Sequence, residues 1–283
     1  MRPPGSYSAA LRAARAAADL APVLLPGTAA TVRANLRLAF GKFPARLPRE
    51  IYRHFAAAAV DLIWFDRLFD PGRFDRHFRF EGGALEHFRK TRPPAAVFAT
   101  GHFGNWELFG AAFRHVGIPL APVARPPGRA WLARRMERFR VEHGQETISK
   151  LHALPLALRA LRAGRCVAFL MDQAAGRHGP EVPFFGRPAR TFTAPAVLAR
   201  KLDLPLYAGY STRMGDGIAY RCFAERVALE SDDIATTRKL NRIFEGYIRA
   251  RPEQWWWFHR RFKPPRAERA GARVGPAGIP IRS

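Results

Sequence analysis

The sequence predicts an α/β fold, with a mostly parallel central sheet flanked by helices and an N-terminal helical segment. Short apolar runs alternate with helix-like segments from residue 95 to residue 250, as expected for strand–helix units. The 283 residues suffice to bury a core without disulfides, and there are only two cysteines. With 48% hydrophobic and 25% charged residues, a wholly disordered or coiled-coil chain is excluded.

The N-terminal part is predicted to be helical. In residues 30–70, apolar side chains recur at helical spacing, as Ile51, Phe55 and Val60 illustrate. Residues 15–33 are apolar but fall short of the ~20 residues that a membrane span needs, and Asp19 and two prolines interrupt them. We therefore expect either an ordinary first helix or one that lies on or dips into a membrane.

The remaining elements follow in order from residue 71 onward. Strands are expected over 95–100, 120–124, 147–149, 166–171, 206–212 and 218–224. Helices are expected over 106–115, 131–142, 154–162, 193–202 and 233–249. We divide the chain into an N-terminal helical, membrane-associating segment (1–70), an α/β domain (71–263) and a basic tail (264–283) whose Pro, Gly, Ala and Arg content predicts disorder.

The net charge of +24 indicates an acidic partner: nucleic acid, an anionic membrane face, an acidic protein or a phosphorylated substrate. Arginine supplies most of the excess, and a GC-rich genome would produce the same bias without any function. The charge alone therefore does not select a partner.

The strongest chemical motif is Gly101-His102-Phe103-Gly104-Asn105-Trp106-Glu107, directly after the first buried strand. Ligands bind at the carboxyl ends of strands in such sheets, so His102 stands where a substrate would arrive. Asn105 is a credible helix N-cap, which puts Glu107 in the first helical turn. Across this corner the carboxylate could fold back to the imidazole and fix its tautomer, leaving the other nitrogen free to take a proton from a hydroxyl.

A simpler interpretation remains open at this point, in which His102 is a loop histidine and Glu107 only begins a helix. A zinc site is disfavoured because no H-E-x-x-H occurs and His115 and His143 lack suitable neighbours. We expect no metal and no cofactor.

The motif, in the form H-x4-E, resembles the lipid A biosynthesis acyltransferase family, the lauroyl and myristoyl transferases of the lysophospholipid acyltransferase superfamily. Other stretches resemble that family in the same order along the chain, from about residue 30 to 263. They are NLRLAF at 35–40, ARP at 124–126, MDQ at 171–173, VPFFG at 182–186 and PEQWWWFHRRFK at 252–263.

The resemblance implies residue roles. His102 would be the general base and Glu107 its acidic partner. A substrate-binding arginine would be Arg138, with Arg140 as the competitor. Asp172 and Arg125 are further substrate-binding candidates. We expect Phe184 and Phe185 to pack in the core or line an acyl channel. The tryptophans at 255–257 would pack in the core or anchor at an interface.

On this basis we expect transfer of a fatty acyl group from an acyl thioester, preferably acyl carrier protein, to a hydroxyl of a lipid acceptor. A lipid A precursor is the preferred acceptor, with a lysophospholipid or glycolipid as the alternative. The expected location is the cytoplasmic face of a bacterial inner membrane, with peripheral or monotopic attachment. Two other classes remain: a basic nucleic-acid-binding protein, which lacks any recognisable module, and an inactive membrane scaffold.

Overall fold

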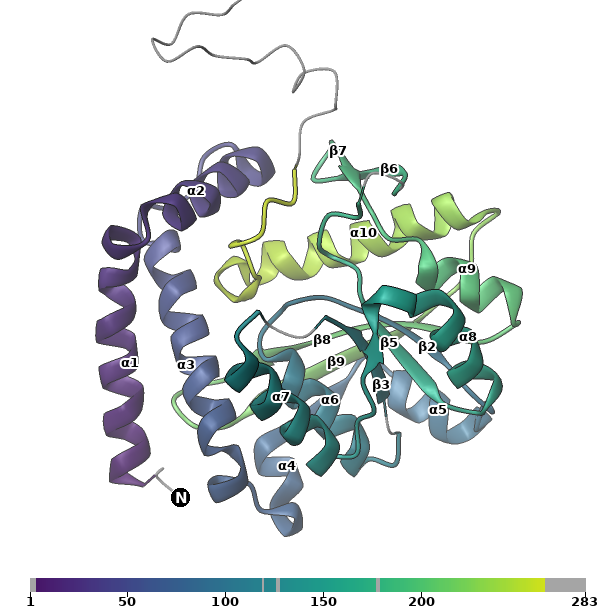
Figure 1. Ribbon diagram of the computed structural model, residues 1–283, viewed down its shortest axis with the longest axis horizontal. Helices are drawn as coiled ribbons and strands as arrows, with labels where there is room; N and C mark the ends of the chain where they lie inside the picture. Colours follow the sequence, from purple (N-terminus) through teal and green to yellow (C-terminus); the bar gives the residue numbers. More distant parts are fainter. Residues whose placement is uncertain (1–3, 119, 126–127, 177–178, 263–283) are drawn as a thin grey trace, which may run out of the picture.

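The computed structural model describes residues 4–118, 120–125, 128–176 and 179–262 (Figure 1). The predicted disorder of the tail concerns residues outside these ranges. Within them the α/β prediction is confirmed: a seven-stranded, mostly parallel sheet is flanked by helices and preceded by helices near the N-terminus.

The large sheet has the strand order β1-β9-β8-β2-β5-β3-β4, and every neighbouring pair is parallel except β8 with β9. The strands that carry the predicted motifs, β2 and β5, lie side by side at its centre. The strand bounds are Phe78–Glu81 (β1), Val97–Thr100 (β2), Leu120–Ala124 (β3), Ile148–Ser149 (β4), Cys166–Leu170 (β5), Leu206–Arg213 (β8) and Tyr220–Val227 (β9).

Each face of the sheet buries its own core, because successive side chains of a strand point to opposite faces. Val97 and Ala99 of β2 pack with α8 (Ala153–Arg162), α9 (Ala194–Lys201) and α10 (Asp233–Ala250). On the other face, Phe98 packs with α6 (Trp106–His115) and α7 (Ala130–Glu142). The sheet is therefore covered on both sides, as the near-continuous apolar runs of the inner strands require.

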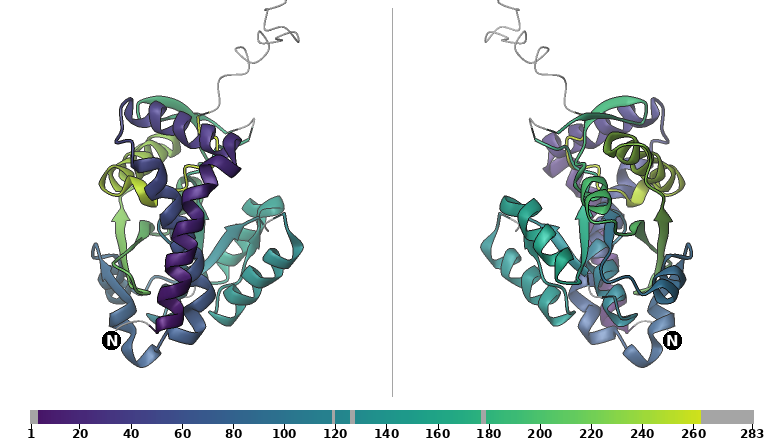
Figure 2. Two further views of the ribbon diagram at one scale, coloured as in Figure 1. Left: turned by 90° about the vertical axis from the view of Figure 1, so that its left-hand side faces the viewer. Right: turned by 90° about the vertical axis from the view of Figure 1, so that its right-hand side faces the viewer.

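In the described residues, the N-terminal segment forms the helices α1 (Gly5–Leu24), α2 (Pro26–Phe40) and α3 (Leu47–Leu68). α1 runs along the left edge of the molecule in Figure 1, where α2 turns away from its end, and it therefore lies in front in the left view of Figure 2. α1 buries Tyr7 and Leu11. None of the helices in the described ranges is long and apolar enough to cross a bilayer.

Several short elements were not predicted. They include α4 (Phe74–His77), α5 (Ala84–Thr91) and three 3-10 turns, η1 (Pro71–Arg73), η2 (Lys150–His152) and η3 (Pro252–Gln254). β6 (Glu181–Phe184) and β7 (Arg187–Arg190) form a separate antiparallel hairpin whose turn is Phe185-Gly186. Phe184 and Phe185 are buried in the core, the first of the two alternatives expected for them.

Candidate active site

The predicted catalytic turn joins β2 to α6 as expected. The side chain of Asn105 accepts a hydrogen bond from the Leu108 N–H at 3.3 Å, which confirms it as the N-cap of α6. Gly104 adopts φ +60°, and a Cβ there would lie 1.9 Å from the Ser211 carbonyl oxygen. A Cβ on Gly101 would lie 3.0 Å from the Asp172 carboxyl. The two glycines thus allow the turn to approach β8 and the aspartate closely.

The imidazole of His102 pairs with Asp172, which follows the neighbouring strand. β2 and β5 run parallel with Thr100 opposite Leu170, so the residues after both strands emerge together. His102 Nδ1 lies 2.8 Å from Asp172 Oδ1, and the backbone N–H of His102 donates to Oδ2 at 2.7 Å. A single carboxylate therefore holds both the ring and the backbone of His102.

This pairing defines the tautomer of His102. An ionised carboxylate only accepts hydrogen bonds, so Nδ1 carries the proton and Nε2 presents its lone pair. The side chain of His102 is 18% exposed, whereas that of Asp172 is 3% exposed. Gln173 Nε2 lies 3.4 Å from His102 Nε2. The amide of Gln173 can thus donate to the Nε2 lone pair, which lies on the side of the ring away from the buried carboxylate.

Asp172 is kept ionised despite its burial. Burial alone would raise the pKa of its carboxyl group, but the charge of His102 and hydrogen bonds from His102 and Trp255 together lower that pKa. A buried carboxylate with these partners is typical of a functional site.

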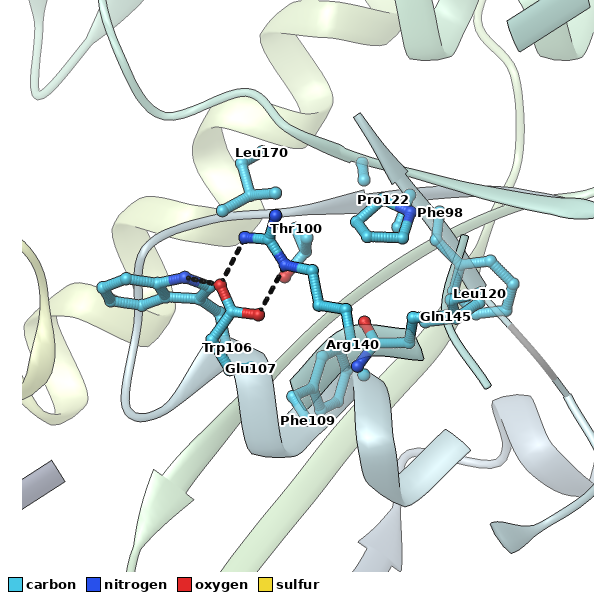
Figure 3. A pocket seen from close by; sticks show the side chains of 13 residues that line it. Phe98, Thr100, Trp106, Glu107, Phe109, Leu120, Pro122, Arg140, Gln145 and Leu170 are labelled. Atoms are coloured by element: carbon cyan, nitrogen blue, oxygen red, sulfur yellow. Dashed lines mark hydrogen bonds and ion pairs between the residues drawn. The ribbon is translucent and has the colours of Figure 1, made fainter. Parts of the chain in front are cut away.

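Glu107 does not pair with His102, contrary to the geometry expected from the sequence. Its carboxylate accepts two hydrogen bonds from Arg140, at 2.8 Å from Nε and 2.6 Å from Nη2, and one from Trp106 Nε1 at 3.0 Å (Figure 3). The helix at 106–115 is continuous, so a residue in its first turn points toward α7 instead of back over the turn. Arg140, the expected competitor of Arg138, is thus engaged in a buried ion pair.

A cavity of about 30 Å³, roughly the size of one water, lies beside this ion pair. Thr100 Oγ1 and Gln145 Nε2 line it, and both atoms lack a hydrogen-bond partner among the described residues (Figure 3). The cavity is too small to admit a lipid chain.

The other predicted binding residues lie apart from His102. Arg138 is exposed on α7, and Arg125 is exposed at the end of β3. Burial, and the charge of Arg125, lower the pKa of Lys150. Lys150 also lines a larger cavity of about 450 Å³, which is mainly apolar and reaches Phe169 and Leu170 of β5. Arg125 and Lys150 therefore lie near this cavity, at the ends of strands β3 and β4.

Sequence reasoning missed two groups that hold the turn at 101–105. Trp255 donates its indole N–H to Asp172 Oδ2 at 2.7 Å, and His54 on α3 donates to the Gly104 carbonyl at 3.2 Å. Trp255 lies within the family-like stretch at 252–263, but the sequence predicts only core packing or interfacial anchoring for it. Nothing in the sequence around His54 marks it as a neighbour of the turn.

Comparison with known proteins gives a consistent assignment. A sequence profile described as bacterial lipid A biosynthesis acyltransferase matches residues 6–264. The lipid A biosynthesis lauroyltransferase of Escherichia coli K12 is 32% identical over 269 residues, 89% of this chain and 81% of the relative. The lipid A biosynthesis palmitoleoyltransferase of the same organism is 29% identical over 245 residues, 82% of this chain and 77% of the relative.

A relative from another lineage also matches. The phosphatidylinositol mannoside acyltransferase of Mycolicibacterium smegmatis is 24% identical over 254 residues, 86% of this chain and 83% of the relative. The similarities thus include proteins named for different lipids.

Proposed function

Because the chain belongs to the bacterial lipid A biosynthesis acyltransferase family and is an enzyme that transfers acyl groups, we propose that His102 is its general base. The reaction would move a fatty acyl group from an acyl thioester to a hydroxyl of a lipid. The observation that carries this proposal is the pairing of His102 Nδ1 with buried Asp172, which leaves the lone pair on Nε2.

The proposed steps use only these groups and the substrates. His102 Nε2 takes the proton of the acceptor hydroxyl as the oxygen attacks the thioester carbonyl carbon. The resulting tetrahedral intermediate expels the thiolate by cleavage of the C–S bond, and the imidazolium returns its proton to the thiolate. Asp172 stabilises the imidazolium and fixes the ring, while Glu107 acts further out by tying α6 to Arg140.

The mainly apolar cavity is the proposed site of the donor acyl chain. Its volume of about 450 Å³ lies in the range of small-molecule pockets, and its β5 wall ends two residues before Asp172. Val197→Phe should narrow it and shift the preference toward shorter chains. An unchanged chain-length profile, measured with a series of acyl thioesters, would place the chain elsewhere.

Acyl carrier protein is the proposed donor, supported by charge. It is an acidic protein, and a net charge of +24 would accelerate its encounter with this chain. Arg125 and Lys150 could meet the phosphate of its prosthetic arm, and Arg138 remains a candidate for a phosphate on either substrate. If so, added salt should raise KM for the acyl carrier protein donor more steeply than for acyl-coenzyme A.

For the acceptor we propose a lipid A precursor, as the names of the two Escherichia coli relatives suggest. Acylation of a glycolipid is the second candidate, favoured by the mycobacterial relative named for phosphatidylinositol mannoside. Mass spectrometry of total lipids from cells with and without the gene distinguishes them, because the missing acyl group identifies the acceptor. The reaction would take place at the cytoplasmic face of a bacterial inner membrane, to which the protein would attach peripherally or monotopically.

The direct test is acyl transfer from a labelled acyl thioester to a lipid extract. His102→Ala should reduce the rate by about 10²–10⁴-fold and leave a folded protein. The matched control is His143→Ala, which removes another His–carboxylate pair, with His143 Nε2 2.9 Å from Asp66 Oδ1. Wild-type turnover in His102→Ala would refute the assignment.

A further inference from the structure

Asp172 accepts hydrogen bonds from three donors, and one of them comes from the far end of the chain. Oδ2 accepts from the His102 backbone N–H and from the Trp255 indole N–H, both at 2.7 Å, while Oδ1 accepts from His102 Nδ1 at 2.8 Å. The indole has no acceptor atom, so this contact favours an unprotonated carboxylate oxygen.

The backbone around Trp255 is itself attached to the catalytic turn. The Trp256 N–H donates to the His102 carbonyl at 2.9 Å, and the Gly104 N–H donates to the Gln254 carbonyl at 2.8 Å. Phe103 and Trp255 form an antiparallel bridge. The indole of Trp255 is 2% exposed and packs edge-on against Trp257, with ring centroids 4.5 Å apart. Its N–H therefore has a defined direction.

We propose that Trp255 is a positioning residue for acyl transfer: its indole N–H occupies Asp172 Oδ2 and so directs Oδ1 to His102 Nδ1. This inference rests on the proposed role of His102 as the base. Trp255 does not touch the reacting atoms and acts only through the aspartate.

The indole contact also affects the charge of the site. Burial disfavours the ionised form of Asp172, and hydrogen bonds from neutral donors such as Trp255 offset this cost. The charged and titratable groups that act on Asp172 are His102, Lys150 and Arg261. His259 lies near, because its Nε2 accepts from the Ala174 N–H at 3.0 Å. Without the indole, the carboxylate would hold the proton shared with His102 more tightly.

The test is the pH dependence of kcat/KM in Trp255→Phe. A general base must be unprotonated, so the rate falls on the acidic side of the apparent pKa of the coupled His102–Asp172 pair. We expect the acidic limb to move up by about one pH unit and the plateau to fall by about tenfold. The matched control is Trp64→Phe, which removes an indole on α3 whose ring packs against Tyr7, with ring centroids 6.1 Å apart, and under the Arg67 guanidinium. Its acidic limb should stay in place.

A second variant guards against a folding defect. Replacing Trp255 with benzothienylalanine keeps the bicyclic shape and removes only the N–H donor, and it should move the limb as Trp255→Phe does. The proposal would be overturned if the acidic limb stayed in place in both Trp255 variants, or if it moved equally in Trp64→Phe.

A readout that needs no turnover separates this proposal from the proposed function. The ring signals of labelled His102 can be followed by NMR against pH. In the Trp255 variants, the pH midpoint of this titration should move up as the acidic limb does. If this movement appears while the wild type lacks acyl transfer, only the proposed function fails. If transfer depends on His102 and the titration is unchanged by the Trp255 variants, only the role of Trp255 fails.

Discussion

At the scale of single residues, two buried carboxylates lie near His102, and their partners separate their roles. Asp172 accepts from His102 and from the neutral indole of Trp255, and neither donor carries a fixed charge. Glu107 is neutralised by Arg140, whose pKa is raised by that carboxylate in spite of the opposing effect of burial. Asp172 is therefore the carboxylate placed to respond when His102 takes up a proton.

Asp172→Asn should reduce the rate of acyl transfer by about 10²–10⁴-fold, because the amide cannot stabilise the imidazolium. The double variant with His102→Ala should be hardly slower than His102→Ala alone, since groups that act as a unit lose their effect together. Single-turnover rates measure both. If the losses of the two single variants multiply in the double variant, Asp172 does not act through His102.

Glu107→Gln should act mainly on stability. It removes the charge that pairs most closely with the buried Arg140 guanidinium and leaves only the longer contact to Glu137, at 4.0 Å. Such a loss costs about 3–5 kcal/mol. Removing both charges in Glu107→Leu/Arg140→Met should recover much of this free energy of unfolding, as measured by denaturant titration. If Glu107→Gln is stably folded and yet loses acyl transfer completely, Glu107 takes a direct part in the reaction.

The sequence identified His102 and Asp172 separately, and it could not pair them. They are 70 residues apart, and their contact depends on β5 lying next to β2, which the order of strands along the chain does not reveal. Glu107 is closer to His102 than Asp172 is along the sequence, but Asp172 is the carboxylate that contacts its ring. Short spacing is informative within a continuous helix, but here it crosses a turn.

At the scale of elements, the turn at 101–105, which carries His102, is held from two sides. On one side, α3 offers the His54 donor to Gly104 and the Ala58 carbonyl, which accepts from Asn105 Nδ2 at 3.0 Å. On the other, the segment at 254–256 forms the backbone bonds described above. From residue 95 onward, the longer helices and strands were predictable from apolar periodicity to within a few residues. The helical stretch expected over 30–70 is instead divided between α2 and α3, and α1 begins already at Gly5. The β6–β7 hairpin was not, because its VPFFG stretch contains a proline and a turn with Phe185 at φ +51°.

His54 links this support to pH. Burial, the largest effect, lowers its pKa from 6.5 to about 4, so the fold holds it neutral while the unfolded chain protonates it. Stability is therefore complete above pH 6.5 and declines as the pH falls toward 4, by roughly 3 kcal/mol for this group. His54→Gln keeps a donor for Gly104 and should flatten the decline. Unfolding free energies at several pH values measure it, and an unchanged slope would exclude His54 as the cause.

At the scale of the whole molecule, the N-terminal helices present apolar side chains to solvent where α1 meets α2. Leu20, Val23, Leu24 and Leu25 at this corner are each more than half exposed, at 60%, 79%, 70% and 52%. Four such residues between positions 20 and 25 form an exposed apolar patch of the kind that marks an interaction surface. Exposed arginines, Arg12 and Arg33 among them, lie on the same two helices. A surface of this kind suits the interface of an anionic membrane.

We therefore predict that the corner contributes the hydrophobic part of membrane attachment and the arginines the electrostatic part. Val23→Gln/Leu24→Gln should weaken binding to anionic vesicles by about tenfold per residue, because each side chain loses apolar burial in the bilayer. The matched control is Ile63→Gln/Val141→Gln, which changes side chains that are 53% and 63% exposed elsewhere on the surface.

High salt should release the wild type only partly, since the Debye length is ~3 Å at 1 M and screening leaves apolar burial intact. It should release the corner variant almost completely. Equal binding of the corner and control variants in vesicle flotation would show that another surface holds the membrane.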